Sequence, residues 1–196
     1  MEVKDRIIWN SIKLFSVKGY KNTSVTDIIT ESNISRGGFY HHFGSKEKLF
    51  LEVIEIANNI WREEVLYSLN EIESPTEKLI KLLENYKDRY LKDHSNFPGG
   101  CIYISLSVEL SEDKDSLYLE IEEGLNGLKR LLGRLVKEAT ERRELVENIN
   151  LERVIELIFT GMIGSSVIYS MDKSDINLDY SISSLTNYIL SFKVNR

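Results

Sequence analysis

Apolar residues recur three and four positions apart along most of this chain, with polar residues between them. This spacing covers several long stretches: residues 3–18, 46–72, 75–93, 101–110, 113–143, 150–171 and 178–192. It predicts amphipathic helices that each bury one face. Because the chain contains only two prolines, Pro75 and Pro98, long unbroken helices are possible. The pattern therefore predicts an all-α protein of about nine helices once shorter ones are included.

Two short helices are predicted close together near the N-terminus. Ser24 and Ser35 each stand immediately before a short helical run, and Asp27 follows Ser24 at the spacing of a capping box. The turn between the two runs is Asn33-Ile34-Ser35, which is short enough to give a helix-turn-helix.

The second short helix has a polar outer face. Apolar residues that can close a small core beneath it are Val25, Ile28, Ile29, Ile34, Phe39 and Phe43. The residues left outside are Arg36, Gly37, Gly38, Tyr40 and His41. A helix with such a face fits the major groove of DNA, with its N-terminal residues nearest the bases.

These residues also carry a resemblance to a known family. The matching residues are Lys18-Gly19-Tyr20, Thr23-Ser24-Val25, Asp27-Ile28, Ile34-Ser35-Arg36-Gly37, Phe39 to Glu47, and Leu49-Phe50. On these matches, residues 4–53 resemble the N-terminal DNA-binding domain of the TetR/AcrR family of one-component transcriptional regulators. The resemblance covers about a quarter of the chain, and its fixed spacing makes it specific. It implies a helix-turn-helix domain at residues 1–46 and a helical effector-binding and dimerisation domain at 47–196.

The resemblance implies that the first domain binds double-stranded operator DNA. The implied contact residues are Thr23, Ser24, Thr26, Ser35, Arg36, Gly37, Gly38, Tyr40, His41 and Lys46. Hydroxyls and unpaired backbone N–H groups at a helix start can hold phosphate. Tyr40, His41 and Lys46 match family positions that grip the DNA backbone, and Arg36 is the candidate for reading guanine. Gly38 departs from the family, which usually has a small hydroxyl residue or alanine there.

Charge is divided unevenly along the chain. Residues 1–48 hold eight Lys or Arg and five Asp or Glu, which gives a net charge of +3. Since the whole chain has a net charge of −6, residues 49–196 have a net charge of −9. A basic head on an acidic body concentrates the attraction for phosphate in one place. Without the motif, ordinary scatter of surface charge would explain the division equally well.

Other signals place the chain in the cytoplasm. Its single cysteine, Cys101, suits a reducing compartment. The N-terminus lacks the apolar segment of a signal peptide, and the longest uncharged apolar-rich run, residues 157–171, is too short to span a membrane. We therefore expect no membrane partner. No cofactor or metal is expected either, because adjacent residues such as His41 and His42 point about 100° apart on a helix and do not chelate together.

The second domain is predicted to bind a small-molecule effector and to form a homodimer. Candidate pocket residues are Trp61, Tyr86, Tyr90, Tyr103, Phe159 and Met162. Each of them could equally be part of the core. The last two helices resemble the pair that forms the family's dimer, and the candidate interface residues are Ile158, Gly161, Ser165, Leu178, Ile182, Leu185, Ile189 and Phe192. Alternatively, both helices only complete the core of one subunit.

The function predicted by these features is a dimeric, ligand-responsive regulator, most readily a repressor, that binds a palindromic operator. An alternative is a repressor on the same scaffold that senses electrophiles or oxidants through Cys101, which stands at a predicted helix start. An enzyme is not expected. The only histidines are His41, His42 and His94, and no catalytic constellation includes them.

Overall fold

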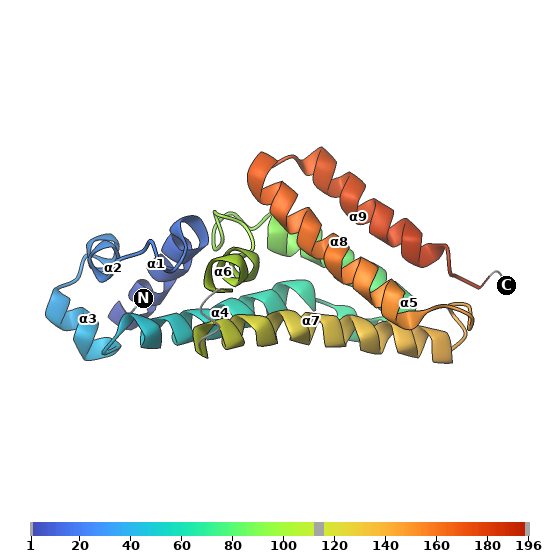
Figure 1. The fold of residues 1–196 in the computed structure, drawn as a ribbon, viewed down its shortest axis with the longest axis horizontal. Coiled ribbons are helices and arrows are strands. Elements are labelled where there is room, and N and C mark those ends of the chain that lie inside the picture. Colours follow the sequence, from blue (N-terminus) through green and yellow to red (C-terminus); the bar gives the residue numbers. More distant parts are fainter. Residues whose placement is uncertain (1, 112–115, 195–196) are drawn as a thin grey trace. The chain divides into compact units, whose positions relative to one another are not determined.

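The computed structural model describes residues 2–111 and 116–194, which form nine α-helices and no β-strand (Figure 1). The helices are α1 Val3–Lys18, α2 Val25–Ser32, α3 Arg36–His42, α4 Lys46–Val65, α5 Pro75–Asn85, α6 Ile102–Leu110, α7 Ser116–Glu141, α8 Leu151–Asp172 and α9 Asp175–Leu190. A 3₁₀ turn, Leu69–Glu71, and a π-helical segment, Tyr86–Leu91, complete the order. The all-α prediction is confirmed.

The helices near the N-terminus begin and end where local chemistry predicts. The Ser24 hydroxyl accepts a hydrogen bond from the backbone N–H of Asp27, and the Asp27 carboxylate accepts one from the backbone N–H of Ser24. Ser35 caps α3 through the N–H of Gly38. Gly19 ends α1 with a φ of 79°, a conformation in which a side chain would be strained.

The fourth helix is shorter than its apolar stripe predicts. The stripe extends to about residue 72, whereas α4 ends at Val65. The buried side-chain amide of Asn85 donates to the carbonyl oxygens of Val65 (3.1 Å) and Tyr67 (2.8 Å). Ser68 then adopts a left-handed backbone with a φ of 57°. A tertiary contact thus ends the helix by taking carbonyls that would otherwise accept from the following turn.

Three other predictions of element limits differ from the structure. The helix predicted up to residue 93 widens into the π-helical segment and ends at Leu91. The connection between the predicted helices 150–171 and 178–192 is shorter than predicted, because Ser174 caps α9, which begins at Asp175. In the predicted helix 113–143, residues 113–115 lie outside the described residues and α7 ends at Glu141.

The chain folds as two compact units, of which the first comprises Met1–Ile60 and Asp93–Gly124. Its centre is an aromatic cluster in which the ring of Tyr20 lies 5.6 Å from that of Phe15 and 4.8 Å from that of Phe50. Helix α6 packs against α1 in this unit. Val108 of α6 is 73% exposed, and the buried face of that helix carries Ile102, Tyr103, Ile104, Leu106 and Leu110.

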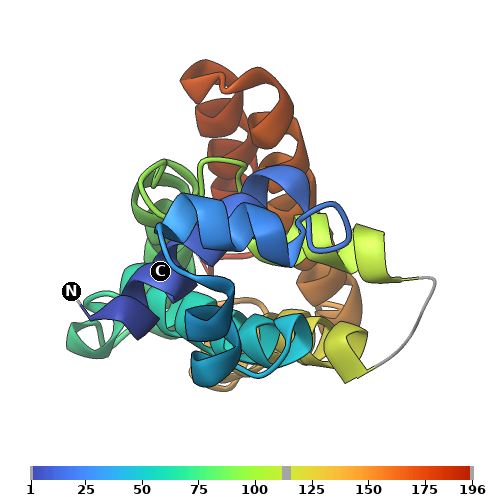
Figure 2. The ribbon, with the colours of Figure 1, turned by 90° about the vertical axis from the view of Figure 1, so that its left-hand side faces the viewer.

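The second unit comprises Trp61–Lys92 and Leu125–Arg196. Helices α8 and α9 lie side by side in it (Figures 1 and 2), and the side chain of Leu185 fills the space beside Gly161. The Tyr86 hydroxyl is hydrogen-bonded to the Ser166 hydroxyl, which joins the π-helical segment to α8. The predicted domain boundary at residue 46 concerns function and stays a prediction.

Helix α8 is long and apolar enough, by length and composition alone, to cross a membrane. Its mean hydropathy reaches 1.6 over a window of which 33% is buried. The uninterrupted run used for the prediction, 157–171, is shorter because Glu156 precedes it, yet the helix continues through that residue. Core helices of soluble proteins have the same composition, so this is weak evidence for a membrane span. It does show that α8 has an apolar surface that its own unit leaves partly uncovered.

Replacement of Asn85 tests how α4 is terminated. In Asn85→Leu the carbonyls of Val65 and Tyr67 lose the hydrogen bonds that the Asn85 side chain donates. We expect the free energy of unfolding to fall by about 1–3 kcal/mol. Urea denaturation followed by circular dichroism measures this. The control is Asn126→Leu at an exposed position of α7, expected to change stability by less than about 0.5 kcal/mol. Equal effects of the two substitutions would contradict the role of Asn85.

Candidate nucleic-acid interface

The candidate interface is built on α3, whose inner side is anchored by aromatic residues. Phe39 is fully buried, and its ring lies 5.9 Å from that of Phe43. Tyr40, the next residue along the helix, is 44% exposed. The Arg36 guanidinium lies 5.8 Å from the centre of the Tyr40 ring, as expected for residues one turn apart. The buried rings hold the helix, while Arg36 and Tyr40 remain on its surface.

Most of the residues predicted to contact DNA are exposed. Those on the surface are Ser24, Thr26, Ser35, Arg36, Gly37, Tyr40 and His41, whereas Gly38 is half-buried. The hydroxyl of Ser24 is already engaged, since it donates to the Asp27 carboxylate at 2.6 Å. These hydrogen bonds from Ser24 hold the pKa of Asp27 below its usual value. The Ser24 hydroxyl is therefore used in capping α2. Thr26 is the other hydroxyl residue in the first turn of α2, and among the described residues no hydrogen bond from its side chain to a carboxylate is seen.

The two adjacent glycines of α3 are not required by packing within the chain. A Cβ on Gly37 would meet only the Ser35 hydroxyl, at 3.9 Å, and one on Gly38 would lie 3.4 Å from the same atom. Both distances are ordinary contacts, and neither residue has a positive φ. Each glycine costs the helix about 1 kcal/mol relative to alanine. Close approach of a partner to the backbone is one use that a glycine permits.

Two predicted DNA contacts are instead engaged inside the fold. Thr23 is fully buried, and its hydroxyl donates to the carbonyl oxygen of Gly19 at 2.7 Å. The Lys46 ammonium donates to the carbonyl oxygens of Tyr20 (3.0 Å) and Thr23 (3.1 Å) and lies 4.0 Å from the centre of the Tyr20 ring. Partial burial lowers the pKa of Lys46, although Glu47 and Glu109 oppose the shift. Thr23 and Lys46 are therefore not among the DNA contacts that we propose below.

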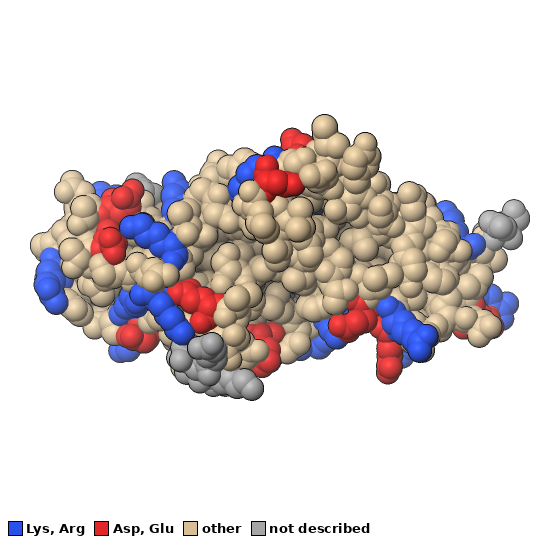
Figure 3. Space-filling view, turned by 45° about the horizontal axis from the view of Figure 1, so that its top comes forward, with Lys and Arg blue, Asp and Glu red and all other residues tan. Residues whose placement is uncertain are grey.

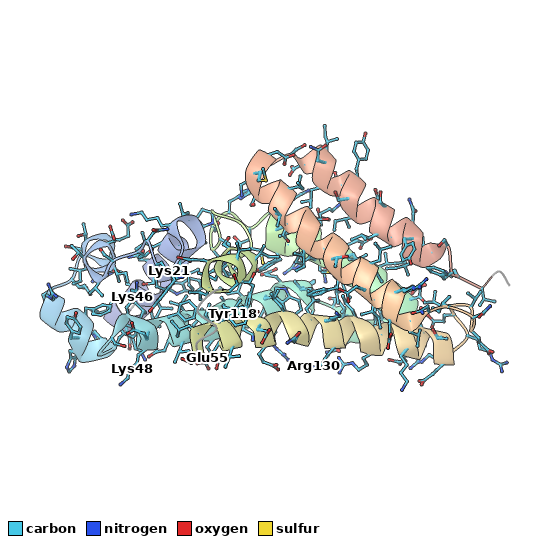
Figure 4. The ribbon with its side chains drawn as sticks, in the orientation of Figure 1. Lys21, Lys46, Lys48, Glu55, Tyr118 and Arg130 are labelled. Atoms are coloured by element: carbon cyan, nitrogen blue, oxygen red, sulfur yellow. The ribbon has the colours of Figure 1, made fainter. Side chains whose placement is uncertain are left out.

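Lys48 is a basic residue that the sequence reasoning missed. It is exposed, and its side chain is the one that approaches Gly44, just after α3. Lys46 and Lys48 both lie in the first turn of α4 (Figure 4), but residues two apart point about 200° apart around a helix. When Lys46 turns into the fold, Lys48 is therefore left on the outside. The helical spacing could have identified this difference, but not which lysine faces inwards.

The predicted effector residues are brought together only in part. In the second unit, Tyr86 and Tyr90 stack with ring centres 5.8 Å apart, and the Tyr86 hydroxyl donates to the carbonyl oxygen of Met162. Trp61 and Phe159, in the same unit, are half-buried. Tyr103 belongs to the first unit, where its hydroxyl donates to the Ile54 carbonyl oxygen and burial raises its pKa. Tyr86, Tyr90 and Met162 thus form one cluster, whereas Tyr103 serves another core.

The predicted dimer residues lie almost entirely inside the chain. Six of them are at most 9% exposed: Ile158, Ser165, Leu178, Ile182, Leu185 and Ile189. Gly161 contacts Leu185 of α9, and Phe192 is half-buried with its ring 5.0 Å from that of Tyr188. Within one chain these residues therefore lie in the seam between α8 and α9, and their part in a dimer stays a prediction.

A different face of the same two helices is exposed and apolar. Its large side chains are Leu157, Val167, Ile168, Met171, Ile176 and Tyr180. Leu157, Gly164, Ile168 and Met171 share one stripe of α8, and a Cβ at Gly164 would meet nothing within 4 Å. Figure 3 shows that the surface over the middle of α8 and α9 is largely free of charged side chains.

Cys101 and the histidines have no metal-binding arrangement in residues 2–111 and 116–194. Within those residues, no group of three or more His, Cys, Asp or Glu could hold a metal ion. Cys101 precedes α6 and is 7% exposed. Low exposure limits the access of solvent reagents to its thiol.

Two family models match this sequence. The model described as bacterial regulatory proteins, tetR family, matches residues 7–53. The model described as tetracyclin repressor-like, C-terminal domain, matches residues 75–185, which is more than half of the chain.

Individual proteins agree with these models. An HTH-type transcriptional regulator in the lacX 3′ region of Lactococcus lactis subsp. lactis is 33% identical over 143 residues, which cover 69% of this chain and 72% of that protein. The biofilm operon icaADBC HTH-type negative transcriptional regulator IcaR of Staphylococcus epidermidis is 29% identical over 133 residues, 66% of this chain and 65% of its own. The crystal structure of a TetR transcriptional regulator from Chloroflexus aurantiacus superposes with a TM-score of 0.88 at 23% identity, covering 97% of this chain and 96% of the other.

Proposed function

This chain belongs to the TetR family of bacterial transcriptional regulators, and we propose that it is a dimeric repressor released from a palindromic operator by a small molecule. The observation that carries the proposal is the surface of α3. Arg36, Gly37, Tyr40 and His41 are exposed there, on a helix that is capped at its start and anchored by Phe39 beneath.

The chemistry of that surface suits the major groove. Arg36 occupies the first position of α3, so its guanidinium extends from the end of the helix that would enter the groove first. A guanidinium pairs bidentately with guanine. Tyr40 supplies a hydroxyl for phosphate, and Gly37 removes a side chain that would hold the backbone away from DNA. Arg36 would then specify sequence, while the other groups would position the helix.

Repression is the proposed sign of regulation. The staphylococcal relative is named as a negative regulator, and its similarity spans about two thirds of both chains. Loss of DNA binding on effector binding follows if the effector prefers a conformation of the dimer with wider spacing between the two reading helices. The cluster of Tyr86, Tyr90 and Met162 is our candidate for part of the effector site. No observation favours the cysteine sensor, because Cys101 is buried.

A second copy of this chain is the proposed partner of the exposed face of α8 and α9. A palindromic operator presents two half-sites about 34–36 Å apart, and a two-fold dimer places one α3 on each. The stripe of Leu157, Ile168 and Met171 is apolar and uncharged, and Gly164 between them leaves room for close approach of another helix. Apolar stripes of this kind remain in water at a cost that dimerisation removes.

Binding to the DNA upstream of its own gene tests the proposed function. We expect the purified protein to protect a palindrome in a footprinting experiment. Arg36→Ala should weaken binding by about 1–3 kcal/mol and relax the preference at one base pair of each half-site. Tyr40→Phe should weaken binding to all sequences similarly. Arg134→Ala, which removes an exposed arginine of α7, is the control and should bind as the unsubstituted protein does. If Arg36→Ala keeps both affinity and selectivity, α3 does not read the operator.

The salt dependence of binding separates Lys48 from Lys46. Removing one lysine that neutralises a phosphate should reduce the slope of log K against log salt concentration by roughly 0.9. We expect Lys48→Gln to reduce the slope, whereas Lys46→Gln should leave it unchanged and lower the free energy of unfolding, because it removes two hydrogen bonds inside the fold. Fluorescence anisotropy over a series of salt concentrations measures the slope. If Lys46→Gln reduces the slope and Lys48→Gln does not, Lys46 leaves its internal partners to bind phosphate.

Sedimentation velocity tests the proposed dimer. Ile168→Glu places a charge in the centre of the exposed face of α8, and we expect it to convert a dimer into monomers, since a buried unpaired charge costs several kcal/mol. Val108→Glu makes the same change at an exposed position of α6 and should leave the dimer intact. A dimer that survives Ile168→Glu would place the interface elsewhere.

A further inference from the structure

A carboxylate from α6 holds the turn that joins α1 to α2. Glu109 Oε2 accepts a hydrogen bond from the backbone N–H of Tyr20 at 2.7 Å, and Glu109 Oε1 accepts one from that of Lys21 at 2.5 Å. All three residues belong to the first compact unit. Both oxygens of one side chain are thus used on two successive amides, across a sequence separation of 88 and 89 residues. Hydrogen bonds to a charged acceptor are about twice as strong as those between neutral groups.

Glycines stand at two points where α6 and its preceding loop approach the end of α1. A Cβ on Gly19 would lie 2.5 Å from Glu109 Oε2, so the carboxylate occupies the space that any other residue would need. In the loop before α6, a Cβ on Gly99 would lie 1.8 Å from the carbonyl oxygen of Ser16 in α1. Helix α6 and its preceding loop therefore meet the end of α1 at two points, and glycine permits the approach at each.

The same turn is held from its other side by residues already described. The Lys46 ammonium takes the carbonyl oxygens of Tyr20 and Thr23, and the Thr23 hydroxyl takes that of Gly19. Lys46 and Thr23 only donate to the carbonyl oxygens of the turn, so the N–H groups of Tyr20 and Lys21 need an acceptor, and Glu109 supplies it. The turn leads directly into Ser24, the cap of α2. Its conformation therefore sets where α2 begins and how α2, which contacts α3, lies on α1.

We propose that Glu109 is a positioning residue for DNA recognition, which holds the α1–α2 turn in the conformation that presents α3. The inference rests on the proposed function, because it concerns operator affinity. It gives a role in DNA recognition to a residue that lies far outside the predicted DNA-binding domain of residues 1–46. Glu109 does not touch DNA in this proposal; it acts through the amides of Tyr20 and Lys21.

Whether replacement of Glu109 weakens or strengthens DNA binding separates a positioning role from simple charge repulsion. A carboxylate near a DNA-binding surface repels phosphate, so removal of an ordinary surface glutamate leaves DNA binding unchanged or strengthens it. Removal of a positioning glutamate weakens binding, although the protein has lost a negative charge. The salt slope should stay the same, because the lysines and arginines that meet phosphate are unaltered.

The first measurement follows the two amides without DNA. In the ¹⁵N-labelled full chain, we expect slow hydrogen exchange at Tyr20 and Lys21 and loss of that protection in Glu109→Ala. Glu109→Gln should show partial protection, because its side chain keeps one oxygen acceptor and its –NH₂ group cannot accept. Unchanged exchange of both amides in Glu109→Ala would overturn the hydrogen bonds themselves.

The second measurement compares operator affinity at a temperature where thermal unfolding shows every variant folded. We expect Glu109→Ala to bind at least about fivefold more weakly than the unsubstituted chain, with Glu109→Gln between them and the salt slope unchanged. The charge-matched control is Glu55→Gln at an exposed position of α4 (Figure 4), which should bind as well or slightly better. If Glu109→Ala does not fold, Glu109→Gln carries the comparison.

The outcomes distinguish this inference from the proposed function. An unsubstituted chain that binds no operator would overturn both. An unsubstituted chain that binds its operator, with Glu109 variants that bind equally well or more tightly than Glu55→Gln, would overturn the positioning role of Glu109 and leave the proposed function standing.

Discussion

In the proposed mode of DNA recognition, the positions of α2 and α3 depend on satisfying the backbone polar groups of the α1–α2 turn. Helices α2 and α3 have eight and seven residues, too few to be stable alone, so their position depends on what holds their ends. In the α1–α2 turn, Glu109 takes two N–H groups while Lys46 and Thr23 take three carbonyl oxygens. Side chains therefore satisfy both kinds of backbone group in this turn, although Lys21 and Asn22 are exposed. In the proposed role of Glu109, the orientation of Arg36 and Tyr40 depends on this turn.

This arrangement changes what the basic residues of the head do. A lysine close to a DNA-binding helix is readily taken as a phosphate ligand, yet Lys46 uses its ammonium within the protein, against the Tyr20 ring and two carbonyl oxygens. In the proposed function, exposed groups such as Arg36 and Lys48 supply the attraction for phosphate. Charge balance along the sequence counts both kinds of lysine equally, although only exposed ones contribute to counterion release.

A similar division applies to α8 and α9. One apolar side of each helix is buried in the packing between them, with Leu185 beside Gly161 and Ile158 fully buried. What remains for a partner is the exposed stripe that adjoins this packed side of α8, where Ile168 and Met171 are exposed. The composition that makes α8 resemble a membrane span is thus explained by burial on one side and by the proposed second subunit on the other.

Local chemistry in the sequence was enough for the helices, their caps and the family. Ser24 with Asp27, Ser35 and Gly19 mark element ends through interactions within a few residues, and the spacing of apolar residues requires no knowledge of the fold. The exposed residues of α3 followed from the same periodicity. Tertiary structure alone decided where α4 ends and which lysine faces inwards. It also decided which apolar residues of α8 stay exposed, and that Glu109 contacts the α1–α2 turn. The physical reason is common to these cases: each depends on a partner that is distant in sequence, such as Asn85 for Val65 or Glu109 for Tyr20, and a periodic pattern shows that a face is buried without showing against what.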